Sequence, residues 1–139
     1  ALVRSISRQL SFVERPPPAP VTVLDLSHNR RWRVAEAEAR GRAVARFVRV
    51  SGSLVELNLI NCGIGDEGAK ALAAGVASSG SMATLILSNN QIGNEGAKAL
   101  AEAVGSSGSM ALKTLYMDDK LLQHKELVAA CKSKGVKLS

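Results

Sequence analysis

A chain of 139 residues has the length of one domain, and 46% hydrophobic with 22% charged residues is the composition of a folded globular protein. No apolar run reaches the roughly 18 residues that a membrane helix requires, so we expect no bilayer crossing. The net charge of +6 lies in residues 1–50, where ten arginines and no lysine face four acids, whereas eight lysines and eight acids balance in residues 51–139.

Residues 1–20 differ in composition from the rest. No acid precedes Glu14, a balance similar to that of an organellar targeting segment. Four prolines between Pro16 and Pro20 predict a stiff extended spacer, which cannot continue a sheet because proline donates no hydrogen bond. We therefore predict an extended arginine- and proline-rich segment over 1–20 and a single domain over 21–139 that ends in a capping helix.

A strand pattern, L-x-x-L-x-L-x-x-N/C, then recurs four times. It predicts a short strand whose leucines face a packed interior and whose final Asn or Cys satisfies buried backbone groups at a turn. The copies begin at Val21, Leu54, Met82 and Leu112, and they end at Asn29, Cys62, Asn90 and Lys120.

A helical pattern follows each of the two middle strands. Residues 64–82 and 92–110 are identical at fifteen of nineteen positions, at an offset of 28. Their apolar positions fall on one helix face: Ile64, Gly68, Ala69, Leu72 and Val76 in the first copy, and Ile92, Gly96, Ala97, Leu100 and Val104 in the second. Asp66 and Asn94 are expected to be N-caps of these helices.

The two outer copies depart from the period. The step from Val21 to Leu54 is 33 residues, which predicts an insertion near residues 30–38 in the first repeat. At the other end, residues 121–131 predict a closing helix and residues 136–138 a final short strand. We expect the strand at 21–26 to present an open edge unless residues 1–15 fold over it.

The strand and helix patterns together resemble the leucine-rich-repeat family, in its ribonuclease-inhibitor-like subtype with units of about 28 residues. The run from Asn89 to Val104, with its IGNEGAKALAE core, is close to that subtype's consensus, and the resemblance covers about residues 21–131. It implies an α/β fold: a short leucine-rich-repeat solenoid of about three to four repeats, with parallel strands on the concave side and helices on the convex side.

The resemblance also implies that partners bind the solvent-facing strand positions. We predict a contact surface there with an apolar middle and acids at both sides, which suits protein recognition. The predicted contact residues are Glu56, Asn58, Ile60, Ile86, Ser88, Tyr116 and Asp118. The alternative is a merely solvated face, because so few repeats offer little area.

A second candidate surface is rich in arginine. It begins in the predicted insertion and continues along the first helix: Arg30, Arg31, Trp32 and Arg33, then Arg40, Arg42, Arg46 and Arg49. Arg and Trp are enriched where binding energy concentrates. Such a surface could bind an acidic protein face or an anionic membrane surface. Nucleic acid is a disfavoured ligand because aromatic residues for base stacking are almost absent. A solvated helix face is the plain alternative.

No pattern points to catalysis, a metal or a cofactor. Asp25, Ser27 and His28 resemble a triad only in their letters, since no nucleophile elbow accompanies them. Cys62 and Cys131 form no zinc or disulfide motif, which indicates an intracellular protein, cytoplasmic or organellar, with the mitochondrion included. We predict a non-catalytic protein-binding module in a hetero-complex. The alternative is an accessory structural subunit of a large assembly, which could be organellar.

Overall fold

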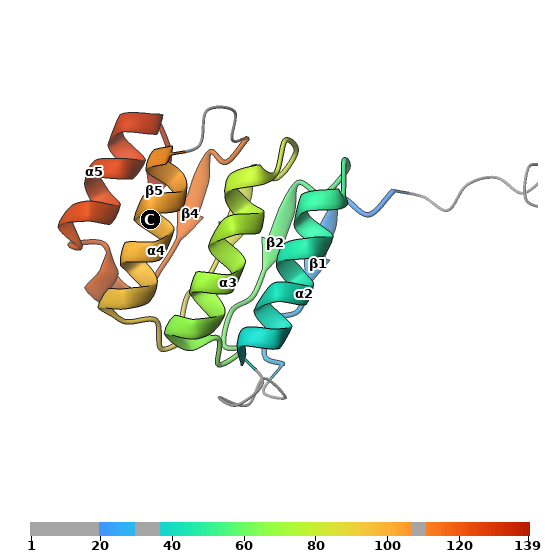
Figure 1. The fold of residues 1–139 in the computed structure, drawn as a ribbon, viewed down its shortest axis with the longest axis horizontal. Helices are drawn as coiled ribbons and strands as arrows, with labels where there is room; N and C mark the ends of the chain where they lie inside the picture. The colour runs from blue at the N-terminus through green and yellow to red at the C-terminus, as the bar shows by residue number, and fades with distance from the viewer. Residues whose placement is uncertain (1–19, 30–36, 107–110) are drawn as a thin grey trace, which may run out of the picture.

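A computed structural model describes residues 20–29, 37–106 and 111–139. Strands and helices alternate along the chain, and the strands form one parallel sheet in sequence order (Figure 1). The elements are β1 (Val23–Asp25), α2 (Ala37–Val50), β2 (Glu56–Asn58), α3 (Gly65–Ser78), β3 (Thr84–Ile86), α4 (Asn94–Ser106), β4 (Thr114–Tyr116), the 3-10 turn η2 (Asp119–Leu121), α5 (Lys125–Lys134) and β5 (Lys137–Leu138). This is the α/β repeat architecture that the sequence predicts.

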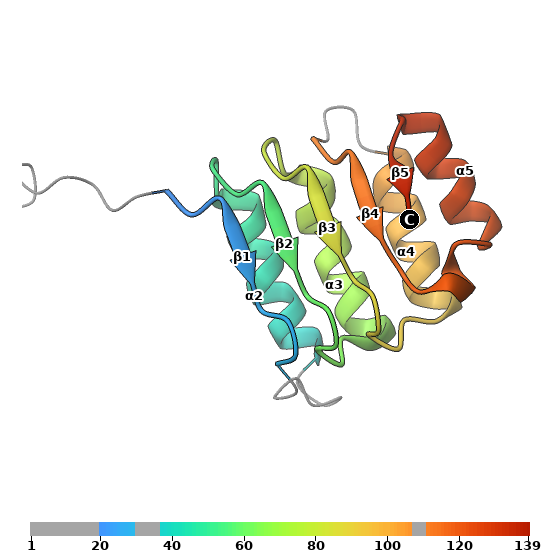
Figure 2. The ribbon, with the colours of Figure 1, turned by 180° about the vertical axis from the view of Figure 1, so that it is seen from behind.

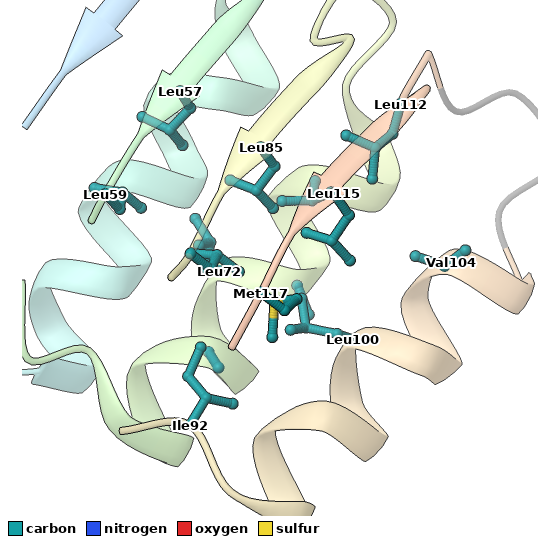
Figure 3. Close-up of a cluster of buried hydrophobic side chains, with 14 of the residues drawn as sticks. Leu57, Leu59, Leu72, Leu85, Ile92, Leu100, Val104, Leu112, Leu115 and Met117 are labelled. Carbon is teal, nitrogen blue, oxygen red and sulfur yellow. The ribbon is translucent and has the colours of Figure 1, made fainter. Parts of the chain in front are cut away.

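The core lies between the sheet and a single layer of helices. The helices cover one face of the sheet, and the opposite face is open (Figures 1 and 2). Leu57, Leu85 and Leu115 occupy one register row, and each is fully buried because alternate strand positions point toward the helices. Helix residues such as Leu72 and Leu100 meet them from the other side (Figure 3).

A buried asparagine closes the turn after β3, as the strand pattern predicts. The Asn90 side chain is fully buried. Its Oδ1 accepts from the backbone N–H of Cys62 at 2.8 Å, and its Nδ2 donates to the carbonyls of Leu59 at 2.6 Å and Leu87 at 3.0 Å. One side chain therefore satisfies backbone groups of two successive repeats and holds them together.

Cys62 takes the same place one repeat earlier. Its thiol is fully buried and lies 2.9 Å from the carbonyl of Leu26, in the preceding repeat. Burial raises the pKa of the Cys62 thiol, and burial likewise raises the pKa of Cys131 in α5. Both cysteines are free and buried, and each packs as a small hydrophobic side chain.

The expected N-caps are wrong, and the reason lies between the repeats. Helix α3 begins with Ile64 at its N-cap, which makes no side-chain hydrogen bond. The carboxylate of Asp66 instead accepts from the N–H groups of Gly93 and Gly96, at 2.7 and 2.9 Å, and so caps the next helix. Asn94, one repeat later, contacts the next repeat through a side chain instead: its Oδ1 lies 2.8 Å from Nε2 of His124.

The C-terminal end differs in detail from the expected helix over 121–131. Leu121 ends the 3-10 turn, and α5 begins only at Lys125. His124 is the N-cap of α5, and its Nδ1 accepts from the N–H of Leu127 at 3.3 Å. The final short strand is confirmed as β5, which pairs with β4.

Helices α2 and α3 pack with their backbones in contact. A Cβ added at Gly75 would lie 2.5 Å from the carbonyl oxygen of Ala45, and one added at Gly41 would lie 2.7 Å from that of Gly68. Gly68, Ala71 and Gly75 of α3 thus lie at this contact, where larger side chains would not fit.

Helices α2, α3 and α4 end at Val50, Ser78 and Ser106, which are 28 residues apart along the chain. By that offset Phe47 of α2 takes the position of Gly75, and α2 therefore lacks this glycine on its outer side. The strand step from Val23 to Glu56 is 33 residues, so the five extra residues lie between β1 and α2, where the insertion was predicted.

Candidate functional site: the open sheet face

The outward strand positions form rows across the sheet. We call this surface the open sheet face (Figure 2). Parallel pairing sets one row as Val23, Glu56, Thr84, Thr114 and Lys137, and the next as Asp25, Asn58, Ile86 and Tyr116. Because the register is unbroken, side chains from five parts of the sequence become neighbours in space.

The middle of this face is apolar and partly exposed. Ile86 and Tyr116 are register partners on β3 and β4, and Tyr116 is 38% exposed. Val55, just before β2, is 44% exposed, and Ile60, just after it, is half-buried. The register therefore places Ile86 beside Tyr116 on neighbouring strands, while Val55 and Ile60 flank the two ends of β2.

Some polar residues on the same face form hydrogen bonds that stabilise turns. Asn58 accepts through Oδ1 from the N–H of Ile60 at 3.1 Å, and Asp118 accepts from the N–H of Asn89 at 2.6 Å, in the preceding repeat. These two predicted contact residues thus stabilise local backbone, whereas the side chains of Glu56 and Ser88 form no such bond within the ranges that the structure describes. Asp118 is the predicted contact residue that ties two repeats together.

Asp25, Ser27 and His28, which resemble a catalytic triad only by residue type, stabilise the turn after β1. Asp25 accepts from the N–H of Ser27 at 2.9 Å, and hydrogen bonds from the Ser27 hydroxyl and N–H hold the pKa of Asp25 below its usual range. His28 has a positive φ of 60° and its Nδ1 lies 3.3 Å from Nδ2 of Asn61 in the next repeat. These contacts give all three residues a structural role.

Charges surround the apolar middle, but not as acids alone. Asp25 and Glu56 lie toward the β1 end of the sheet. At the other end Lys137 of β5 lies beside Thr114, and the exposed Lys113 precedes that strand, so basic groups accompany Asp118 there. The prediction missed Lys137 because a two-residue strand after a helix carries little alternation to identify its outward side.

The arginine-rich candidate surface is described only in part. Arg30, Arg31, Trp32 and Arg33 lie outside the described residues. On α2, Arg42, Arg46 and Arg49 are exposed and Arg40 is half-buried. These arginines lie on the helix side of the sheet, away from the open sheet face.

Other classes of site are not evident in the described part of the chain. Over residues 20–29, 37–106 and 111–139, no three His, Cys, Asp or Glu side chains lie close enough to hold a metal ion. Within the same ranges, no helix is long and apolar enough to span a bilayer.

Comparison with known proteins identifies the repeats. Residues 51–73 and 81–101 match the family model described as Leucine Rich repeat. No curated protein sequence matches the chain. Several solved structures match the fold, among them "Leiomodin-1 Actin-Binding Site 2 (ABS2)", with a TM-score of 0.68, 16% identity, and coverage of 85% of this chain and 69% of that chain. At such identity the likeness is one of fold, and the ribonuclease-inhibitor-like subtype remains a prediction.

Proposed function

We propose that this leucine-rich-repeat chain is a non-catalytic module that binds another protein through its open sheet face. The observation that carries the proposal is the adjacency of Ile86 and Tyr116 on neighbouring strands, with Ile60 and Val55 close along the chain of β2. An apolar centre with a charged rim is the arrangement of residues found at protein interfaces. The leucine-rich repeats and the fold shared with an actin-binding site of leiomodin-1 support an interaction role.

The proposed contact set retains every residue assigned from the sequence on this face. It comprises Glu56, Asn58, Ile60, Ile86, Ser88, Tyr116 and Asp118. Arg30, Arg31, Trp32 and Arg33 would add a basic contact, and an arginine-rich surface of this kind speeds association with an acidic partner by electrostatic steering. The site of action is proposed to be intracellular, within a hetero-complex.

The test compares partner capture by matched variants. Ile86→Asp places a carboxylate in the apolar centre, where burial without a partner is costly, and should weaken binding at least tenfold. Val128→Asp makes the same change at an exposed position on α5 and should leave binding unchanged. Proteins recovered from the native source with wild type and Val128→Asp, but not with Ile86→Asp, would be purified and titrated, with actin as a first defined probe.

The outcome that contradicts the proposal is equal binding by all three proteins. Charge reversal at Arg31 and Arg33 would separately test the basic contact, and it should slow association more than it speeds dissociation. Circular dichroism of each variant would establish that the fold is intact.

A second candidate, an accessory structural subunit, is favoured by the apolar β1 end. Val23 of β1 is 53% exposed and Val21, two residues before it, is 44% exposed, and β1 pairs only with β2 among the described residues. In that case residues 1–33 would be the docking element. Deleting residues 1–20 distinguishes the two: a free-standing module keeps its affinity, whereas a structural subunit is lost from its complex.

A further inference from the structure

A groove runs between α2 and α3 on the helix side of the molecule. It has a volume of about 240 Å³. One wall consists of Arg42, Arg46 and Arg49, which follow one another at helical spacings of four and three residues. The floor consists of small residues only: Ala45, Ala71, Ala74 and Gly75.

The floor is small because the two helices meet there. A Cβ on Gly75 would lie 2.5 Å from the backbone of Ala45, so no larger side chain fits without separating α2 and α3. An incoming peptide can therefore approach both helix backbones while the arginines reach across it. The groove is a consequence of the close packing and not of a loose fit.

Two of the three arginines of the groove have no acidic partner among the residues that the structure describes. Arg42 pairs with Glu38 on its own helix, with its side chain still 70% exposed. Arg46 and Arg49 have no ion pair or hydrogen bond within the ranges that the structure covers. No acidic residue lines the groove.

The next groove along the solenoid serves as an internal comparison. Between α3 and α4 the lining residues are Lys70, Glu95, Lys98, Ala99 and Glu102, in which both signs of charge are present. The offset of 28 makes Arg46, Ala74 and Glu102 equivalent positions, so the charge changes from one repeat to the next. A uniform basic wall is thus a property of the α2–α3 groove and not of the repeat as such.

We propose that the α2–α3 groove binds an acidic segment of a partner protein, with the guanidinium groups of Arg42, Arg46 and Arg49 contacting its carboxylates. The planar guanidinium fork matches a carboxylate in two parallel hydrogen bonds. Arg42 and Arg46 are about 6 Å apart along the helix axis, and Arg49 lies about 4.5 Å further. Carboxylates four residues apart on a partner helix, or on alternate residues of an extended segment, have a similar spacing.

The lining favours a peptide over the other anionic macromolecules. It contains no aromatic side chain on which a nucleic-acid base could stack. It also contains no apolar side chain larger than alanine to insert among lipid chains. The groove lies on the other side of the sheet from the open sheet face, so this site goes beyond the proposed function and either can fail without the other.

The test uses a fluorescent peptide with glutamates at positions i, i+4 and i+7, and its glutamine counterpart. Wild type should bind the glutamate peptide at least tenfold more tightly than the glutamine peptide. Binding should weaken as NaCl rises from about 50 mM to about 500 mM. Arg46→Glu with Arg49→Ala should weaken binding at least tenfold, and both new residues already stand at equivalent positions, Glu102 and Ala77.

Two further variants separate the groove from overall charge and from folding. Lys98→Glu with Lys132→Ala changes the net charge equally on other exposed parts of the molecule, and it should weaken binding less than twofold. Ala74→Glu keeps all three arginines but places a carboxylate in the groove, and it should also weaken binding at least tenfold. Circular dichroism and thermal midpoints should remain those of wild type.

The proposal is overturned by any of three results. Equal weakening by the two double variants would indicate long-range charge alone. Equal binding of the glutamate and glutamine peptides would exclude carboxylate recognition. Tighter, arginine-dependent binding of phosphatidylserine vesicles or of oligouridylate would assign the groove to lipid or RNA instead.

Discussion

Replacing Asn90 by alanine tests how the repeats are joined. The Asn90 side chain is fully buried and bonds backbone groups of the second and third repeats. In Asn90→Ala the N–H of Cys62 and the carbonyls of Leu59 and Leu87 lose this partner. A buried polar group left unsatisfied costs about 1–3 kcal/mol.

We expect a loss near the lower limit for each group, because the polar void left by the amide can admit a water molecule. Three groups at about 1 kcal/mol give a decrease of about 3 kcal/mol in the free energy of unfolding. Against a total of about 5–15 kcal/mol for a domain, the variant remains folded at room temperature but is clearly weakened.

The measurement is urea denaturation followed by far-ultraviolet circular dichroism, with the midpoint shifting at constant slope. Gln123→Ala removes an exposed amide and should change stability by no more than about 0.5 kcal/mol. Asn90→Cys introduces the residue found at Cys62, whose thiol reaches the carbonyl of Leu26, and should lose only about half as much as alanine. A loss below about 1 kcal/mol for Asn90→Ala would refute the assignment of an inter-repeat role.

Two other predictions follow from packing and burial. Gly75→Phe, which copies the residue at the equivalent position Phe47, should lower the free energy of unfolding by more than about 3 kcal/mol or prevent folding, because its Cβ alone would overlap Ala45. The control Phe47→Gly should lower it far less. Similar urea midpoints for the two variants would contradict the packing argument. Cys62 and Cys131 should react with a thiol reagent only as the chain unfolds, because both are buried. Burial also raises both pKa values above the unfolded value of about 8.5. The stability that the neutral thiols contribute is therefore complete below that pH and is lost as the pH rises through the pKa values of the folded state. Urea midpoints from pH 7 to pH 10 check this, and a steeper decline in Cys131→Ala than in wild type would be the contrary result.

The sequence alone determined the repeat, its strands and the inward residues. The Leu positions of the strand pattern, such as Leu57 and Leu85, are all buried in the two middle repeats, and Asn90 closes its turn as the pattern predicts. These features follow from local periodicity, because each repeat must bury the same face against its neighbours. For the same reason the outward row that holds Ile86 and Tyr116 could be assigned in advance.

Which groups meet between repeats depends on how the repeats stack in three dimensions. Asp66 has the position of a cap for its own helix, yet it caps α4, because the spacing between stacked repeats brings the N–H groups of Gly93 and Gly96 to its carboxylate. The arginines of α2 have the pattern of a solvated helix face in sequence, and they become one wall of a groove only because Gly75 lets α3 approach the backbone of α2. A periodic sequence specifies what each repeat buries, whereas contacts across repeats depend on the distance and register at which the repeats stack.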